Sequence, residues 1–456
     1  MNALWTSAEI AAATDGTASA DFSVTGMTFD SREVRPGDLF VAMPGTAREG
    51  HQFVAGAFEQ GAEAALVSSP VDGPHVLVAD TFTALRALAR AARERCSATV
   101  IGVTGSVGKT STKEALFAAL DRVAPTRTHR SVRSYNNHTG VPLSLARMPR
   151  DCTFAVLEMG MNHAGEIAEL TALVRPHLAL ITAIAPAHME MLGSLQAIAD
   201  AKAEIFAGLE PDGIAIIPND SEFRDRLVKA ARRTADRIIT FGSGDADVHA
   251  VHAVAEGQGS LITASLLESE LTFTIAQCGA HWVSNALAVL AAVEAVGADV
   301  AVAGLALADM GGLKGRGERH SIAVGEGSAL LIDGSYNANP ASMSATLASL
   351  GDERGVERRI AVLGPMRELG KHSDELHAGL APEVIAAEVD ELILIGPEME
   401  PLAAAVGASV AVHRAATVDD AITKLLALLR PGDAVLVKAS NSVGLAALVD
   451  RVTGGR

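Results

Sequence analysis

A glycine-rich run that ends in lysine and threonine is the part of the sequence best suited to chemistry. Residues 102–110 read Gly-Val-Thr-Gly-Ser-Val-Gly-Lys-Thr. They lie between a predicted strand at 99–104 and a predicted helix at 110–120. A loop in this position turns successive backbone N–H groups toward one point at the positive end of a helix, where phosphate binds. The run therefore predicts a nucleoside triphosphate site.

The residues of this run would have separate tasks. Gly105 and Gly108 have no Cβ and would let the backbone approach a phosphate. Lys109 would reach the β- and γ-phosphates, and the Thr110 hydroxyl would bind Mg²⁺. The run is a variant of the usual phosphate loop, because Val103 stands where that pattern has glycine. The residues expected to bind the nucleotide here are Thr104, Gly105, Ser106, Val107, Gly108, Lys109, Thr110 and Ser111.

The loop indicates nucleotide use but not a reaction, and several alternatives stay open. A chance glycine-rich turn before a helix would look similar. A GTPase would also need a guanine-reading loop of the type Asn-Lys-x-Asp, which the sequence lacks. A small-molecule kinase is compatible with the loop, so other motifs must decide.

Two polar side chains follow neighbouring strands and are candidate metal ligands. Glu158 lies near the end of the strand predicted at 154–159, and His188 follows the strand predicted at 178–183. The carboxyl ends of parallel strands meet at the ligand crevice of an α/β sheet, and Mg²⁺ prefers oxygen ligands. The alternatives are an exposed glutamate at a strand end and a structural histidine.

Four other positions combine a possible site with a structural alternative. The Asn285 amide could pair with an adenine edge or begin the apolar helix predicted there. Arg316 lies in a basic, glycine-rich loop that could bind phosphate or form a solvated hinge. Asp333 opens a loop after a strand, where sites are often built, or an ordinary tight turn. Lys202, in a predicted helix, is by composition a surface lysine.

Composition limits the class of protein. The chain has 456 residues, enough for about three domains, and is 49% hydrophobic and 20% charged, as globular proteins are. Its net charge of −17 argues against nucleic-acid binding. The three cysteines show neither metal-ligand spacing nor a disulfide framework, which favours a reducing cytoplasm. Without a signal-peptide pattern or a run of about 20 apolar residues, we expect no leader and no membrane-spanning helix.

The order of predicted elements gives an α/β fold. Short strands and alanine-rich helices extend to about residue 95. Regular alternation of strands and helices follows, which predicts a mostly parallel sheet covered by helices. A β-rich insertion, two apolar helices and a glycine-rich loop then lead to a second α/β series without a GxGxxG motif, so nicotinamide binding has no support. The strands predicted in the two series lie at 99–104, 154–159, 178–183, 213–217, 238–241, 329–332, 359–363, 391–395 and 434–438.

The motifs, in this order, resemble the Mur ligase superfamily, and its MurF type most closely. The resemblance extends over nearly the whole chain, although the Asp-Asn-Pro-Arg signature of the preceding, diamino-acid-adding ligases is absent. The sequence departs from the pattern at Gly334, at Pro365 and in Lys-Ala-Ser-Asn-Ser at 438–442. The matching segments are 30–42, 50–53, the phosphate loop, 135–142, 157–161, 201–206, 334–340 and 363–370.

The resemblance implies three domains and one reaction. The domains would be a small uridine-nucleotide domain at 1–95 that binds a UDP-muramoyl-peptide, a central ATP-binding domain at 96–312 and a C-terminal, Rossmann-like ligase domain at 313–456. The implied enzyme is an ATP-dependent amide-bond ligase that adds D-Ala-D-Ala to UDP-N-acetylmuramoyl-tripeptide, through an acyl phosphate and a tetrahedral intermediate, in peptidoglycan precursor synthesis. A monomer is expected. The alternatives are a related ligase that uses another amine and a nucleotide-dependent binding module without ligase activity.

The resemblance also implies roles for single residues. Lys109, His188, Lys202 and Arg316 would be catalytic, with Arg316 on the ATP phosphates. Two Mg²⁺ ions would bind to Thr110, Glu158, His188 and Lys202, with Lys202 carrying a carbamate that turns its amine into an oxygen ligand. Asn285 would contact adenine, and Asp333 would also lie at the nucleotide. The expected substrate contacts are Ser31, Arg32, His51, Asn136, Asn137 and Asn337.

Overall fold

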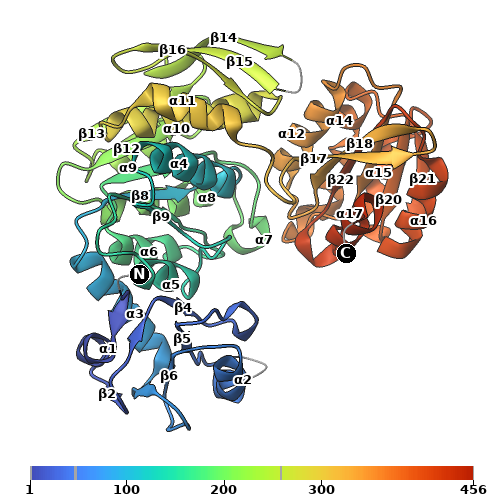
Figure 1. Cartoon of the computed structure of the whole chain (residues 1–456). Helices are drawn as coiled ribbons and strands as arrows, with labels where there is room; N and C mark the ends of the chain where they lie inside the picture. Colours follow the sequence, from blue (N-terminus) through green and yellow to red (C-terminus); the bar gives the residue numbers. More distant parts are fainter. Residues whose placement is uncertain (1–2, 46–48, 257–258, 455–456) are drawn as a thin grey trace.

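Three sheets of five or more strands, each with helices packed against it, follow one another along the chain (Figure 1). The computed structural model describes residues 3–45, 49–256 and 259–454. In Figure 1 the N-terminal unit lies below the central unit, and the C-terminal unit lies beside the central unit. Within the described parts of the chain, no helix is both long enough and apolar enough to cross a membrane.

The N-terminal unit is built on a five-stranded sheet with the order β2-β7-β6-β5-β4. Its strands are β2 (Thr17–Ala18), β4 (Gly26–Thr28), β5 (Asp38–Val41), β6 (Ala64–Val67) and β7 (His75–Leu77). A short pair, β1 (Trp5–Thr6) and β3 (Ser23–Val24), lies beside the helix α1 (Ser7–Thr14). The other helical segments are η1 (Ser31–Glu33), η2 (Gly50–Phe53), α2 (Val54–Glu59) and α3 (Thr81–Glu94).

The central unit holds a nine-stranded sheet with the order β16-β15-β14-β13-β12-β11-β8-β10-β9. The strands from β9 to β14 pair in parallel, and β15 and β16 are antiparallel. The chain turns to opposite sides of β8, so the carboxyl ends of β8, β10 and β11 form a switch point, where α/β sheets bind ligands. The strands are β8 (Thr99–Thr104), β9 (Thr128–Arg130), β10 (Phe154–Glu158), β11 (Leu178–Ile181), β12 (Ile214–Pro218), β13 (Arg237–Gly242), β14 (Val248–Glu256), β15 (Gly259–Ser265) and β16 (Glu270–Ile275).

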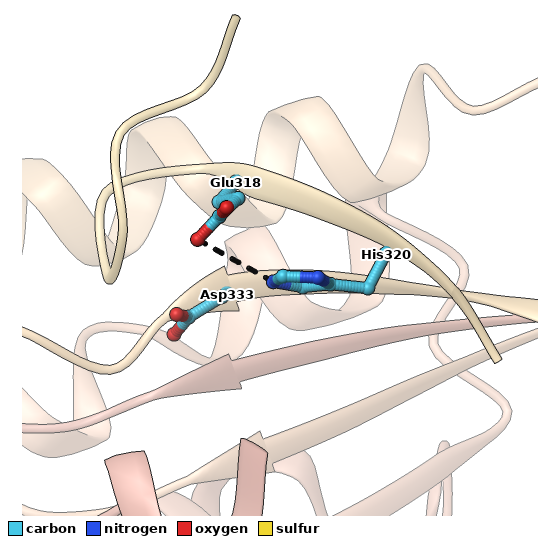
Figure 2. A group of neighbouring side chains, drawn as sticks. All are labelled: Glu318, His320 and Asp333. Atoms are coloured by element: carbon cyan, nitrogen blue, oxygen red, sulfur yellow. Dashed lines mark ion pairs between the residues drawn. The ribbon is translucent and has the colours of Figure 1, made fainter. Parts of the chain in front are cut away.

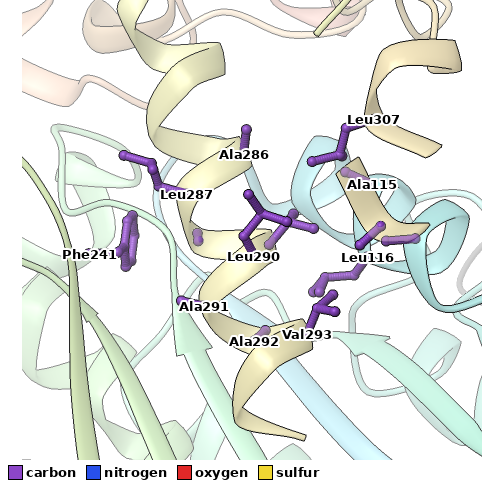
Figure 3. Close-up of a cluster of buried hydrophobic side chains, with 14 of the residues drawn as sticks. Ala115, Leu116, Phe241, Ala286, Leu287, Leu290, Ala291, Ala292, Val293 and Leu307 are labelled. Carbon is purple, nitrogen blue, oxygen red and sulfur yellow. The ribbon is translucent and has the colours of Figure 1, made fainter. Parts of the chain in front are cut away.

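Helix α10 forms the centre of this unit's core. It is apolar on nearly every face because α4 and α11 pack on one side and the sheet on the other (Figure 3). Leu290, Leu116 of α4 and Leu307 of α11 meet there, all buried. The helices of the unit are α4 (Lys109–Val123), α5 (Gly140–Ala146), α6 (Glu166–Val174), α7 (Met189–Leu192), α8 (Leu195–Ala203), η3 (Glu204–Gly208), α9 (Arg224–Ala231), α10 (Ala280–Ala295) and α11 (Val300–Asp309).

The C-terminal unit has a six-stranded sheet with the order β17-β18-β22-β19-β20-β21, in which only β17 is antiparallel to its neighbour. Its strands are β17 (Glu318–Val324), β18 (Gly327–Gly334), β19 (Arg358–Leu363), β20 (Glu391–Ile395), β21 (Ala411–Ala415) and β22 (Asp433–Lys438). Its helical segments are α12 (Pro340–Gly351), η4 (Gly370–His372), α13 (Ser373–Ala378), α14 (Ala381–Ala386), η5 (Pro397–Met399), α15 (Glu400–Val406), α16 (Val418–Leu428), η6 (Asn441–Val443) and α17 (Ala446–Thr453).

The expected α/β fold with three units is confirmed. The glycine-rich segment at 311–317, for which the sequence predicts a hinge or loop, lies between α11 and β17. It forms a turn in which the Arg316 N–H donates to the Leu313 carbonyl at 2.7 Å and the Gly317 N–H donates to the Asp333 carbonyl at 2.7 Å. The antiparallel strand β17 begins directly after this turn and fixes it to β18.

Candidate active site

A cavity of about 710 Å³ lies between the central and C-terminal units, where the phosphate loop ends. This volume falls in the range of small-molecule sites. The sequence-predicted residues that line it come from both units and from segments more than 200 residues apart. They are Ser106, Val107, Gly108, Lys109, Thr110, Ser111, Asn136, Asn137, Glu158, His188, Asn285, Arg316 and Asn337.

The phosphate loop connects β8 to α4, and two of its positions require glycine. Gly105 has φ +151°, and a Cβ there would lie 1.9 Å from Thr182 Oγ1. Gly108 has φ +85°, and its Cβ would lie 2.9 Å from Asn285 Oδ1. A residue directly after β11 fixes the loop, because the Thr182 hydroxyl donates to the Val107 carbonyl at 2.5 Å. Thr104 is buried behind the loop and does not line the cavity.

The polar side chains at the loop meet at the end of β10. Lys109 Nζ donates to the carbonyl of Gly105 at 2.6 Å, and burial lowers the pKa of Lys109. The Thr110 hydroxyl donates to Glu158 Oε2 at 2.9 Å. Asn136 Nδ2 donates to Glu158 Oε1 at 2.7 Å. A carboxylate and a hydroxyl thus lie together beside the phosphate loop, and such oxygen donors suit Mg²⁺.

Lys202 is not a surface lysine, so the interpretation from composition is wrong. It lies near the end of α8, is fully buried and is not among the residues that line the cavity. Its Nζ makes no hydrogen bond to any residue that the structure describes. Burial lowers its pKa well below the ordinary value, so the neutral amine is favoured. A neutral, unpartnered amine fits conversion to a carbamate, which would supply oxygen atoms in its place.

Asn285 does not begin a helix, so that alternative is wrong. It is the sixth residue of α10, which starts after Gly279, and its side chain faces the phosphate loop at Gly108. Arg316 comes from the turn between the units. Its guanidinium donates to the hydroxyl of Ser134 at 3.3 Å and lies over the Tyr336 ring, 4.0 Å from its centre.

Asp333 holds two loops together and does not line the cavity. Its carboxylate is buried and accepts the N–H of Gly315 and the N–H of Ser335, each at 2.9 Å. Figure 2 shows it near Glu318 and His320, whose side chains face each other at 3.5 Å. Both of its carboxylate oxygens accept backbone N–H groups, so in this structure Asp333 positions the turn that carries Arg316.

The remaining predicted substrate residues lie in the N-terminal unit, away from this cavity. Ser31 and Arg32 belong to η1, and the exposed Arg32 side chain pairs with Asp30 at 2.6 Å. His51 Nε2 accepts the N–H of Ser68 at 3.0 Å.

Glu33, at the end of η1, connects this part of the molecule to the cavity. Its carboxylate lies 2.5 Å from the guanidinium of Arg133 and accepts the hydroxyl of Tyr135 at 3.2 Å. The segment that carries these two residues continues into the cavity-lining Asn136 and Asn137.

Sequence reasoning missed Lys438 as a member of the cavity. Lys438 ends β22, is buried, and donates to the carbonyl of Asn337 at 2.9 Å. Burial lowers its pKa to about 7. The rule on strand ends that selected Glu158 also applies to Lys438, so a signal was present. Other missed lining residues, including Ser134, His281, Trp282 and Tyr336, depend on how the two units pack and carry no such signal.

The comparisons with known proteins agree with this architecture in all three units. Residues 23–97 match the model of the Mur ligase family catalytic domain, residues 103–293 the Mur ligase middle domain, and residues 315–441 the glutamate ligase domain of Mur ligases. A UDP-N-acetylmuramoyl-tripeptide–D-alanyl-D-alanine ligase of Escherichia coli (strain K12) is 34% identical over 436 residues, which cover 94% of each chain. The ligase of that name from Synechocystis is 35% identical over 443 residues and covers 95% of this chain and 93% of its own.

Solved structures are also similar to this chain over nearly its full length. The crystal structure of MurF from Acinetobacter baumannii is 30% identical, covers 99% of both chains and superposes with a TM-score of 0.85. That of a MurF ligase from Thermotoga maritima in complex with ADP is 27% identical, covers 95% of this chain and 98% of its own, and gives a TM-score of 0.78. The chain belongs to the Mur ligase family. Within that family it is of the MurF type, as its full-length relatives and its structural neighbours are.

Proposed function

We propose that this protein is an ATP-dependent, ADP-forming ligase that joins D-Ala-D-Ala to UDP-N-acetylmuramoyl-tripeptide in peptidoglycan precursor synthesis. One observation carries the proposal: the phosphate loop and Arg316, from different units, line the same cavity. The relatives over the full length of the chain, which bear the name of this activity, support the choice of substrates. The enzyme would act in the cytoplasm as a monomer, with domains at 1–95, 96–312 and 313–456.

The chemistry begins with activation of a carboxylate. A carboxylate resists attack because its negative charge repels a nucleophile and oxide is a poor leaving group. Transfer of the γ-phosphoryl group of ATP to the terminal carboxylate of the tripeptide gives an acyl phosphate and ADP. The amine of D-Ala-D-Ala then attacks the acyl carbon, and the tetrahedral intermediate collapses to the amide and phosphate.

The side chains of this chain would neutralise and align the phosphates. Lys109, at the start of α4, would exchange its contact with the Gly105 carbonyl for one with the β- and γ-phosphates. Arg316, which lines the same cavity, would bind the transferring group, because its planar guanidinium can bind two oxygens. Asn285 would contact the adenine. Closure of the two units over the substrates would exclude water, which hydrolyses an acyl phosphate.

The metal-binding assignments fit the residues present. Thr110, Glu158 and His188 would hold Mg²⁺, and Lys202, as a carbamate, would add oxygen ligands. The support is the pair of oxygen donors beside the phosphate loop and the buried, unpartnered Lys202 amine. Bound Mg²⁺ would supply positive charge next to the phosphates.

The substrate contacts would extend from the cavity to the N-terminal unit. Ser31, Arg32 and His51 would bind the uridine nucleotide, and the link from Glu33 to the cavity wall supports a continuous path. Asn136, Asn137 and Asn337 would contact the muramoyl-peptide part. Asp333 would act on the nucleotide through the turn that it holds.

Release of phosphate from ATP tests this function. The protein should release phosphate rapidly only when UDP-N-acetylmuramoyl-tripeptide and D-Ala-D-Ala are both present with Mg²⁺. Release that depends on the tripeptide but on another amine would indicate a related ligase. Release that needs neither compound would indicate a nucleotide-dependent module and would exclude the proposal.

A further inference from the structure

One ion pair between the central and C-terminal units involves a candidate metal ligand. His188 follows β11 and immediately precedes α7 in the central unit. Its Nδ1 lies 2.6 Å from Oε2 of Glu368, which comes from the loop between β19 and η4 in the C-terminal unit. The backbone adds a second contact, because the N–H of Glu190 donates to the Glu368 carbonyl at 3.1 Å. Side chain and main chain of Glu368 therefore both contact the segment that carries His188, the side chain as a close ion pair.

The backbone at this contact is strained on both sides. His188 has φ +57° and Glu368 has φ +64°, in the left-handed region that L-residues rarely adopt. Gly370, with φ +56°, brings the C-terminal loop so near that a Cβ would lie 3.3 Å from Cα of Glu190. Strained residues persist where the surroundings over-determine them, and they cluster at functional sites.

A contribution to folding stability does not explain why this ion pair is present. Glu368 is about half exposed and His188 about a quarter exposed, and ion pairs with such access to water add little to stability. The pair does leave only Nε2 of the His188 ring free for a metal. In metal sites the second ring nitrogen of a histidine ligand is commonly held by a carboxylate, which fixes the ring and raises its basicity.

We propose that Glu368 is a positioning residue that orients His188 for metal binding when the C-terminal unit docks. Docking of the two units and completion of the metal site are then one event, because the carboxylate comes from one unit and the histidine from the other. The inference rests on the proposed function only in taking His188 as a metal ligand.

Binding of Mn²⁺ to the ADP-bound protein, measured by electron paramagnetic resonance, tests the inference without ligase turnover. Glu368→Gln should weaken Mn²⁺ binding about 10- to 100-fold, the usual effect of losing the carboxylate behind a histidine ligand. Glu368→Asp, which keeps the charge but shortens the reach, should give an intermediate affinity. The control is Glu375→Gln, which removes an exposed glutamate paired with His372 at 3.5 Å within the C-terminal unit and should leave the affinity unchanged.

A double-mutant cycle shows whether Glu368 acts through His188. If it does, Glu368→Gln should add no further loss of Mn²⁺ affinity to His188→Gln. Wild-type affinity in Glu368→Gln, or losses that add fully in the double variant, would overturn the inference. Failure of the proposed function looks different: the wild type would not ligate, while the effect of Glu368→Gln on Mn²⁺ binding would remain.

Discussion

Replacing Asp333 by asparagine tests whether this carboxylate holds the loops that present Arg316 and Asn337 to the cavity. Its two oxygens accept the N–H groups of Gly315 and Ser335, each at 2.9 Å, in a fully buried position. Asparagine has the same shape, but only one of its two polar atoms is an acceptor. One bond is lost, and the amide NH₂ then faces a backbone N–H for which the described residues provide no other acceptor.

The expected cost follows from the kind of bond that is lost. Hydrogen bonds to charged groups contribute about 1.5–3 kcal/mol, and a buried N–H left without a partner costs about 1–3 kcal/mol. A local destabilisation of about 2–3 kcal/mol should make the Gly315 and Ser335 amides exchange with solvent roughly 30- to 150-fold faster, if exchange follows local opening. Hydrogen–deuterium exchange of peptides over 313–336 measures this directly. Phosphate release should also slow, because Arg316 is less firmly held.

Asp450→Asn is the matched control. Asp450 contacts Lys314 of the same turn at 3.6 Å, but both side chains are largely exposed, so the change should be within about 0.5 kcal/mol. Unchanged hydrogen–deuterium exchange of the Gly315 and Ser335 amides in Asp333→Asn would show that the carboxylate does not hold these loops. Loss of ADP affinity without faster exchange would instead make Asp333 a direct nucleotide ligand.

Three further predictions follow from the site and the core. Lys109→Ala should lower ATP-dependent turnover by orders of magnitude, because it removes the positive charge at the first residue of α4 that would neutralise the phosphates. Near-normal turnover would contradict this role. Gly105→Ala should weaken ADP binding at least about 10-fold in calorimetry, since its Cβ would lie 1.9 Å from Thr182 Oγ1 at φ +151°; unchanged affinity would show that the loop adapts. Burial lowers the pKa of His129 to about 4, below the value near 6.5 of an unfolded chain, so the unfolded state binds the extra proton between these values. Stability to urea should therefore fall as the pH drops from about 6.5 to about 4, and His129→Gln should flatten that part of the profile; an identical profile would exclude His129 as a cause.

The sequence predicted the site best where one strand end defines a residue's place. Glu158 and the phosphate loop lie at the carboxyl ends of β10 and β8, and the alternation of strands and helices is enough to place them together. The β-branched run at 99–104 coincides with β8 because a buried parallel strand requires such residues on both faces.

Features that depend on packing between distant segments could not be predicted in this way. Lys202 has a sequence environment like that of a surface lysine, and only the packing of α8 buries it. The glycines of the turn at Arg316 predict a hinge or loop, but they give no sign that the Asp333 carboxylate, near the end of β18, accepts the Gly315 N–H. The contact between His188 and Glu368 joins loops of two units and has no local pattern.

Oxygen from the substrate carboxylate shows whether ligation passes through an acyl phosphate. The protein would be incubated with ATP, Mg²⁺, D-Ala-D-Ala and UDP-N-acetylmuramoyl-tripeptide labelled with ¹⁸O in its terminal carboxylate. The masses of the products would then be measured by mass spectrometry. Ligation through an acyl phosphate should give an amide product equal to the sum of the two substrates less one water, with one ¹⁸O atom transferred to the released phosphate. Phosphate without label, or ATP hydrolysis without a condensed product, would contradict it.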